Sequence, residues 1–274
     1  MLRPEQISQY REQGYVLVAN IFSPDELDRM VAAFDEIVRR RSGATDEVAS
    51  GWNGGWQDNL QEMRLVHADD VQAYSAEWTR VLVHDRFTEA MADLIGPNVQ
   101  LHHSKLFQKP PENGAAFPMH QDYAYFPHEM HSVMACTIHL SDSTEEMGCM
   151  RVVPASHKLG PLALYQETNG KKGALYLDPN EYPIEKGTSC AARQGDVLFF
   201  NYLTIHGSGI NVSDRARKTV LVQVRDAGDR PTQDIHRSHS QGLMLRGNNP
   251  FDSLTAATAN LGDQRSGELI GVNR

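Results

Sequence analysis

Hydrophobic positions in the first hundred residues repeat with a helical period in three segments. Residues 4–12 are polar apart from Ile7 and Tyr10, and Gly14 ends this predicted helix. A second helix starts at Ser23, an N-cap residue that is followed by Pro24 at the first helical position and by Glu26 at the third, where it can complete a capping box. Its apolar stripe repeats every three or four residues and precedes three arginines at the C-terminal end, where cations favour the helix dipole (Leu27, Met30, Val31, Phe34, Ile37, Val38; Arg39, Arg40, Arg41). A third helix is predicted over 86–95, ending at Gly96-Pro97.

Short apolar runs rich in β-branched and aromatic residues dominate the rest of the chain. The predicted strands cover 15–18, 99–109, 133–140, 197–203 and 220–224, whereas the Gly-, Trp- and Asn-rich segment 42–62 is typical of a loop. Helices followed by strands predict an α+β fold, mainly β, with helices packed on an antiparallel core such as a distorted jelly roll. With no repeat or linker in its sequence, the chain is interpreted as a single domain, 1–274.

Composition limits the classes of binding partner and the cell compartment to be expected. A net charge of -9 argues against nucleic acid and anionic membranes. No segment has the roughly 18 consecutive apolar residues of a membrane span, and no apolar stretch follows Arg3 as in a signal peptide. Three cysteines without zinc-site spacing (Cys136, Cys149, Cys190) are expected to be reduced, as in a cytoplasmic protein.

Two histidines and one carboxylate form a candidate metal site. His120 and Asp122 are two residues apart, so on an extended segment their side chains point to the same side. His206 follows the apolar run 197–200. Two imidazoles and one carboxylate suit a facial iron(II) centre with open positions, although zinc or manganese accepts the same donors.

A candidate carboxylate-binding residue, Arg217, follows His206 in the sequence. Arg217 lies eleven residues after His206, and its guanidinium can bind a carboxylate in a bidentate manner. The Ser208 hydroxyl can donate a hydrogen bond to the same carboxylate. Arg215 and Lys218 are expected to be solvated surface charges.

The chain resembles the phytanoyl-CoA dioxygenase family of iron(II)- and 2-oxoglutarate-dependent oxygenases. The resemblance rests on motifs in family order between about Gly14 and Arg225: Gly96-Pro97-Asn98-Val99, Lys109-Pro110-Pro111, His120-Gln121-Asp122 with Tyr125-Phe126-Pro127, the segments 148–158 and 195–200, and His206-Gly207-Ser208-Gly209 with Asn211. Each motif is weak alone, but the ordered set is specific.

The resemblance implies a double-stranded β-helix core over about 14–225, with 226–274 as a C-terminal extension. It implies that His120, Asp122 and His206 bind iron(II), and that Arg217 and Ser208 hold the distal carboxylate of 2-oxoglutarate. Thr137 and Lys105 are expected beside this cosubstrate. The implied reaction uses O2 to hydroxylate an unactivated C–H bond and releases succinate and CO2.

The sequence says less about the identity of the substrate than about the metal and the cosubstrate. Tyr123, Tyr125 and Phe126 follow two of the predicted ligands and can wall a pocket, Trp56 belongs to a possible lid loop, and Arg225 can meet an anionic group. A free small metabolite, such as a natural-product intermediate, is favoured, and an acyl-CoA, as for a 2-hydroxylase of the phytanoyl-CoA type, is the alternative. A metal-dependent hydrolase and a non-catalytic binding protein are further alternatives, and the oligomeric state stays open.

Overall fold

Two antiparallel sheets face each other across a cavity in this computed structural model, which describes residues 1–42, 65–112, 114–165, 175–233 and 237–251. The larger sheet follows the order β1 (Tyr15–Val18), β8 (Val197–Asn201), β5 (Met134–His139), β10 (Arg217–Asp226), β3 (Val99–Lys109) and β11 (Met244–Arg246), and β2 (Val66–Asp69) also pairs with β3. The smaller sheet follows the order β4 (Phe117–His120), β9 (His206–Ser208), β6 (Met150–Val152) and β7 (Thr188–Cys190). The predicted mainly-β, jelly-roll type of fold is confirmed.

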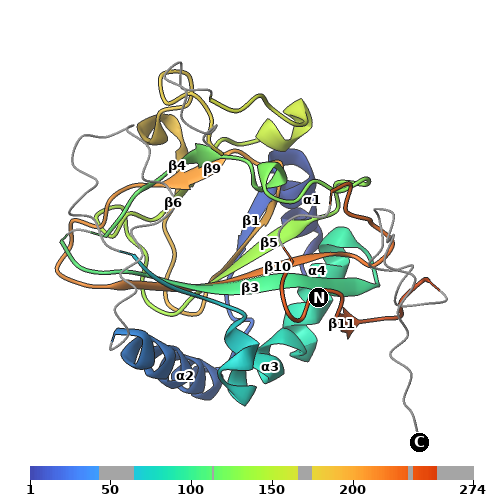
Figure 1. Ribbon diagram of the computed structural model, residues 1–274, viewed down its shortest axis with the longest axis horizontal. Coiled ribbons are helices and arrows are strands. Elements are labelled where there is room, and N and C mark those ends of the chain that lie inside the picture. Colours follow the sequence, from blue (N-terminus) through green and yellow to red (C-terminus); the bar gives the residue numbers. More distant parts are fainter. Residues whose placement is uncertain (43–64, 113, 166–174, 234–236, 252–274) are drawn as a thin grey trace, which may run out of the picture.

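Helices cover the outer face of the larger sheet (Figure 1). They are α1 (Pro4–Gln13), α2 (Pro24–Ser42), α3 (Ala76–Leu82) and α4 (Asp85–Ile95). The predicted first, second and third helices correspond to α1, α2 and α4. The seven-residue α3 was not predicted, because it is too short to show a clear periodicity.

The alternation of side chains along β10 separates the core from the cavity. Val220, Val222 and Val224 join the cluster that contains Phe34 of α2 and Phe87 of α4. The odd-numbered residues point to the other side, where four of them line the cavity: Arg217, Thr219, Leu221 and Gln223. One strand therefore anchors the helices with one face and builds the site with the other.

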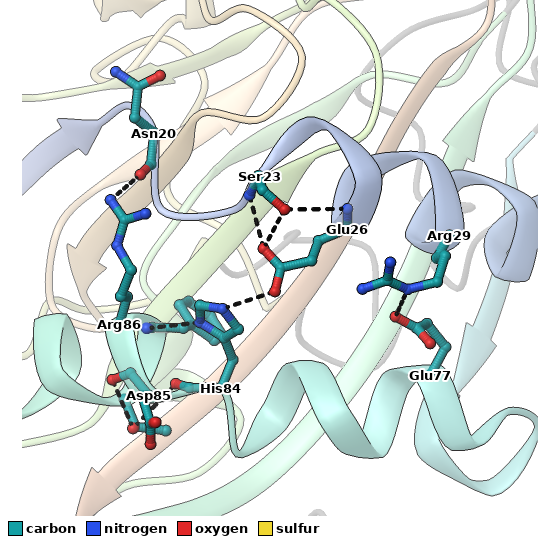
Figure 2. Close-up of polar contacts among 10 residues, drawn as sticks. Asn20, Ser23, Glu26, Arg29, Glu77, His84, Asp85 and Arg86 are labelled. Atoms are coloured by element: carbon teal, nitrogen blue, oxygen red, sulfur yellow. Dashed lines mark hydrogen bonds and ion pairs between the residues drawn. The ribbon is translucent and has the colours of Figure 1, made fainter.

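The N-terminus of α2 is fixed by the predicted capping box (Figure 2). The backbone N–H and the hydroxyl of Ser23 donate to the Glu26 carboxylate at 2.7 and 2.8 Å. The same carboxylate lies 3.2 Å from Nε2 of His84, the residue that precedes α4. Arg29 of α2 contacts Glu77 of α3 at 3.2 Å, so polar contacts connect the three helices.

Some predicted boundaries differ from the structure. The strand predicted over 197–203 ends at Asn201, since the next residues form a turn in which the Thr204 N–H donates to the Asn201 carbonyl at 2.8 Å. The strand predicted over 220–224 extends over all of β10. The short strands β2, β4, β6, β7, β9 and β11 were not predicted.

The division into a core and a C-terminal extension stays a prediction, although β11, which belongs to the predicted extension, pairs with β3. The predicted loop 42–62, including Trp56, lies almost entirely outside the described residues. In the described part of the chain, no helix has the length and apolar character needed to cross a membrane.

Candidate metal centre and cosubstrate pocket

His120, Asp122 and His206 converge on one point inside the cavity. His120 ends β4, His206 opens β9, and the two residues are paired across the smaller sheet. Asp122 opens a single 3-10 turn directly after β4, so it is not on the extended segment that the sequence suggested. Nε2 of each histidine lies 3.6 Å from Oδ1 of Asp122, and each of the three buried side chains offers a donor atom within 4.8 Å of the others.

Backbone contacts select the histidine tautomers. Nδ1 of His120 lies 2.8 Å from the Pro118 carbonyl, and Nδ1 of His206 lies 2.9 Å from the Thr204 carbonyl. Because a carbonyl only accepts, each Nδ1 carries the hydrogen and each Nε2 presents a lone pair. Burial, and secondarily the neighbouring His120, lowers the pKa of His206 to about 4, so His206 is neutral at pH 7. The donor set therefore fits a divalent metal ion of the iron, zinc or manganese kind.

Gln223 orients the carboxylate. Its side-chain amide donates to Oδ2 of Asp122 at 2.6 Å, which leaves Oδ1 toward the histidines. Burial alone would raise the pKa of Asp122, but His206, His120 and Gln223 together lower it to about 2. Gln223 was not predicted from the sequence, although its position six residues after Arg217 on a strand places both on the same face.

The cavity has a volume of about 310 Å³, at the small end of the range for ligand pockets. Ser208, Thr137, Lys105, Tyr125 and Phe126 line it, and their roles beside the cosubstrate or substrate stay predictions. Further aromatic lining comes from Phe107, Phe117 and Phe200.

Two of the residues suggested for substrate binding do not reach this cavity in the described part of the chain. Tyr123 packs against Tyr202 with ring centroids 5.7 Å apart. Arg225 is 1 % exposed and lies outside the lining residues, because it stands beyond Gln223 along β10. A role of either residue in substrate binding stays a prediction.

Arg217 is a buried cation at one end of the cavity. It opens β10, is 4 % exposed, and donates through Nη1 to the Gly148 carbonyl. Within the described residues, Nε has no hydrogen-bond partner and no carboxylate lies within ion-pair distance of the guanidinium. Burial lowers the pKa of Arg217 to about 10, so the side chain is still charged at pH 7. An unneutralised buried cation is costly, so an anion bound beside Arg217 in the cavity would be stabilised.

Lys105, Lys218 and Arg215 have surroundings unlike those of Arg217. Lys105 lines the cavity and forms an ion pair with Asp69 at 3.5 Å. Lys218 contacts Asp35 at 2.6 Å on the outer side of the sheet, and Arg215 is exposed, as expected for surface charges.

Comparisons with known proteins agree with this geometry. The family model described as "Phytanoyl-CoA dioxygenase (PhyH)" matches residues 10–219. Peroxisomal phytanoyl-CoA dioxygenase of Rattus norvegicus is 29% identical over 232 residues, covering 80% of this chain and 67% of that protein. Ectoine dioxygenase of Bordetella parapertussis is 27% identical over 241 residues, covering 81% and 74%.

A solved structure supports the fold. The non-haem, alpha-ketoglutarate-dependent carbocyclase SnoK from nogalamycin biosynthesis superposes with a TM-score of 0.68 at 24% identity, covering 88% of this chain and 93% of SnoK. At this identity the similarity concerns the fold. Because the family model spans most of the chain, including the three candidate ligands and Arg217, the predicted enzyme class is confirmed, and the chain belongs to the phytanoyl-CoA dioxygenase (PhyH) family of iron- and 2-oxoglutarate-dependent dioxygenases.

Proposed function

We propose that this enzyme hydroxylates an unactivated C–H bond of a small organic molecule, consuming O2 and 2-oxoglutarate and releasing succinate and CO2. The observation that carries the proposal is the combination, in one small cavity, of a buried His-Asp-His trio and a buried guanidinium without a carboxylate partner among the described residues. A metal-dependent hydrolase would need the trio but has no use for Arg217.

The residues of the cavity have separate roles in this proposal. His120, Asp122 and His206 would hold iron(II), which with 2-oxoglutarate supplies the oxidising chemistry. Arg217 and Ser208 would bind the distal carboxylate of the cosubstrate. Gln223 keeps the Asp122 carboxylate oriented, and the aromatic lining around Phe107 and Phe200 excludes water from the reacting atoms.

In this proposal the substrate occupies the part of the cavity lined by Tyr125, Phe126 and His103. The Lys105–Asp69 ion pair also lines the cavity. An aromatic wall beside a few polar groups is typical of a site for a small metabolite that is partly apolar and partly polar. A free metabolite is therefore our first candidate; the names of the mammalian relatives support an acyl-CoA as the second.

The test is an anaerobic titration of the iron(II)-loaded protein with 2-oxoglutarate, followed by visible absorbance. We expect a saturable band that is lost in Asp122→Ala and His206→Ala. In Arg217→Ala the cosubstrate should bind more weakly by about 2–5 kcal/mol, the usual cost of removing one partner of a buried charged contact. Succinate release would then identify the substrate, with free metabolites and acyl-CoA thioesters screened side by side.

Two results would contradict the proposal. One is tight binding of zinc with no response to 2-oxoglutarate, which would favour a hydrolase. The other is an unchanged cosubstrate affinity in Arg217→Ala, which would transfer the anion-binding role to another cation.

A further inference from the structure

A second cation is buried beside Arg217. Lys109, the last residue of β3, is the cross-strand partner of Arg217 on β10, and its side chain has an exposed fraction of 0%. Its Nζ lies 5.3 Å from the ring centre of Phe117, which lines the cavity. Within the described residues no carboxylate forms an ion pair with either Lys109 or Arg217. Two adjacent positive charges without a protein counter-charge are unfavourable unless an anion binds between or beside them.

Lys109 fixes the direction of the Ser208 hydroxyl. Nζ lies 2.7 Å from Ser208 Oγ and 2.5 Å from the Gly209 carbonyl. Burial, and secondarily the neighbouring Arg217, lowers the pKa of Lys109 well below its usual value, whereas an anion bound beside the two side chains favours the charged form. In the charged form Nζ carries donors only, so Ser208 Oγ accepts from Nζ and its own hydrogen is available for another acceptor. Since Ser208 lines the cavity, that hydrogen can be donated to a carboxylate there.

The two cations also hold two backbone segments in contact. Arg217 donates to the carbonyl of Gly148, and Lys109 donates to the carbonyl of Gly209. Gly148 has a φ of 62°, and a Cβ at this position would lie 2.3 Å from the Gly209 carbonyl oxygen. The segments that carry the two acceptors are therefore packed directly on each other.

From these contacts we propose that Lys109 is a positioning residue for the cosubstrate: it orients the Ser208 hydroxyl toward the distal carboxylate and adds the second positive charge that makes this end of the cavity selective for a 2-oxo acid with two carboxylates. The inference rests on the proposed function, because it assumes that Arg217 and Ser208 bind that carboxylate. Lys109 does not line the cavity, so it acts through Ser208 and through its charge.

The experiment compares two 2-oxo acids on the iron(II)-loaded protein under anaerobic conditions, with binding measured by calorimetry. 2-Oxoglutarate has the distal carboxylate, and pyruvate lacks it. In Lys109→Met we expect the Kd for 2-oxoglutarate to rise by about tenfold or more, as for a lost charge-assisted contact, while the Kd for pyruvate changes by less than about twofold. Lys218→Met, which removes a neighbouring lysine on the outer face of β10, is the matched control and should change neither Kd.

A double-mutant cycle tests whether Lys109 affects cosubstrate binding through Ser208. In a Ser208→Ala background, Lys109→Met should raise the Kd for 2-oxoglutarate by clearly less than in the wild-type background, because the two side chains act as a unit. If Lys109→Met does not fold, Lys109→Gln keeps a donor and removes the charge, and the calorimetric stoichiometry reports the folded fraction separately from the Kd.

The outcomes separate this inference from the proposed function. Absence of any 2-oxoglutarate binding by the wild-type protein overturns the proposed function and the inference with it. Binding that depends on Arg217 but not on Lys109 overturns the inference alone. An equal loss of affinity for 2-oxoglutarate and pyruvate also overturns it, since that result indicates general damage to the site.

Discussion

At the residue scale, Asp122 is the side chain on which the contacts of the candidate metal centre converge. Both histidines lie 3.6 Å from one of its oxygens, and Gln223 donates to the other. Replacing Asp122 by Ala should abolish tight iron(II) binding and succinate formation, because two imidazoles alone do not complete the facial set. Iron content after gel filtration checks this prediction; Asp28→Ala, on the exposed side of α2, serves as the control.

Gln223 contacts the candidate metal centre without being a ligand, so replacing it should weaken metal binding rather than abolish it. Gln223→Leu keeps the three ligands but removes the amide that orients Asp122. Loss of such an outer contact typically weakens metal binding by about 10–100-fold. A competition titration with a chelator measures the change, and the exposed Gln194→Leu should leave the affinity as it is. An unchanged affinity in Gln223→Leu would mean that the histidines alone orient the carboxylate.

The sequence singled out His120, Asp122, His206 and Arg217 as candidates through their residue types, their spacing and the ordered motifs of the resemblance. Gln223 and Lys109 were missed as functional residues because their roles depend on strand register. Lys109 faces Arg217 only through the pairing of β3 with β10, a pairing whose register shifts at Gln223/Val224. A single sequence shows neither the pairing nor the shift.

At the element scale, the long helices and strands were predictable and the smaller sheet was not. The eleven residues of β3 and the stripe of α2 repeat their pattern several times. In contrast, β6, β7 and β9 have three residues each and β4 has four, too few to establish a period. The candidate ligands His120 and His206 belong to these short strands, so their residue types and motifs pointed to them although their strands could not be predicted.

The start of α2 offers a test at this scale. Ser23→Ala removes the hydroxyl contacts with Glu26 and should lower the free energy of unfolding by about 1 kcal/mol, the typical value for an N-cap. Urea denaturation measures the loss. Ser8→Ala, exposed within α1, should be neutral or slightly stabilising because alanine favours helices. Equal stabilities for Ser23→Ala and the wild-type protein would show that the backbone contact of Ser23 suffices.

At the scale of the whole molecule, ligand binding should stabilise the fold. Iron(II) with 2-oxoglutarate should raise the Tm under anaerobic conditions, since a ligand at 100 times its Kd adds about 2.7 kcal/mol to the free energy of unfolding. In Arg217→Ala, only the part of the rise due to iron should remain at the same concentrations. Thermal denaturation followed by circular dichroism gives both values; a full cosubstrate effect in Arg217→Ala would contradict the assigned anion site.

Acid should destabilise the protein through buried neutral histidines. Burial, and secondarily Arg217, lowers the pKa of His139 to about 4, below the value of about 6.5 in the unfolded chain. The unfolded state therefore binds a proton that the folded state does not, and stability falls as the pH decreases from 6.5 to 4. His206 contributes in the same direction. In His139→Asn the loss over this window should be smaller by up to about 3 kcal/mol, as measured by urea denaturation at several pH values.

The three-residue strand β9 has a consequence for how such an enzyme can be altered. It carries both His206 and Ser208, two residues apart on one face, so the span between the candidate metal ligand and the proposed carboxylate contact is set by the pleat of a single strand. The side chains proposed to face the substrate, His103 of β3 and Tyr125 and Phe126 after β4, come from other segments. Variation at these three positions is expected to change substrate scope, while β9 and the residues proposed to hold iron and the cosubstrate stay as they are.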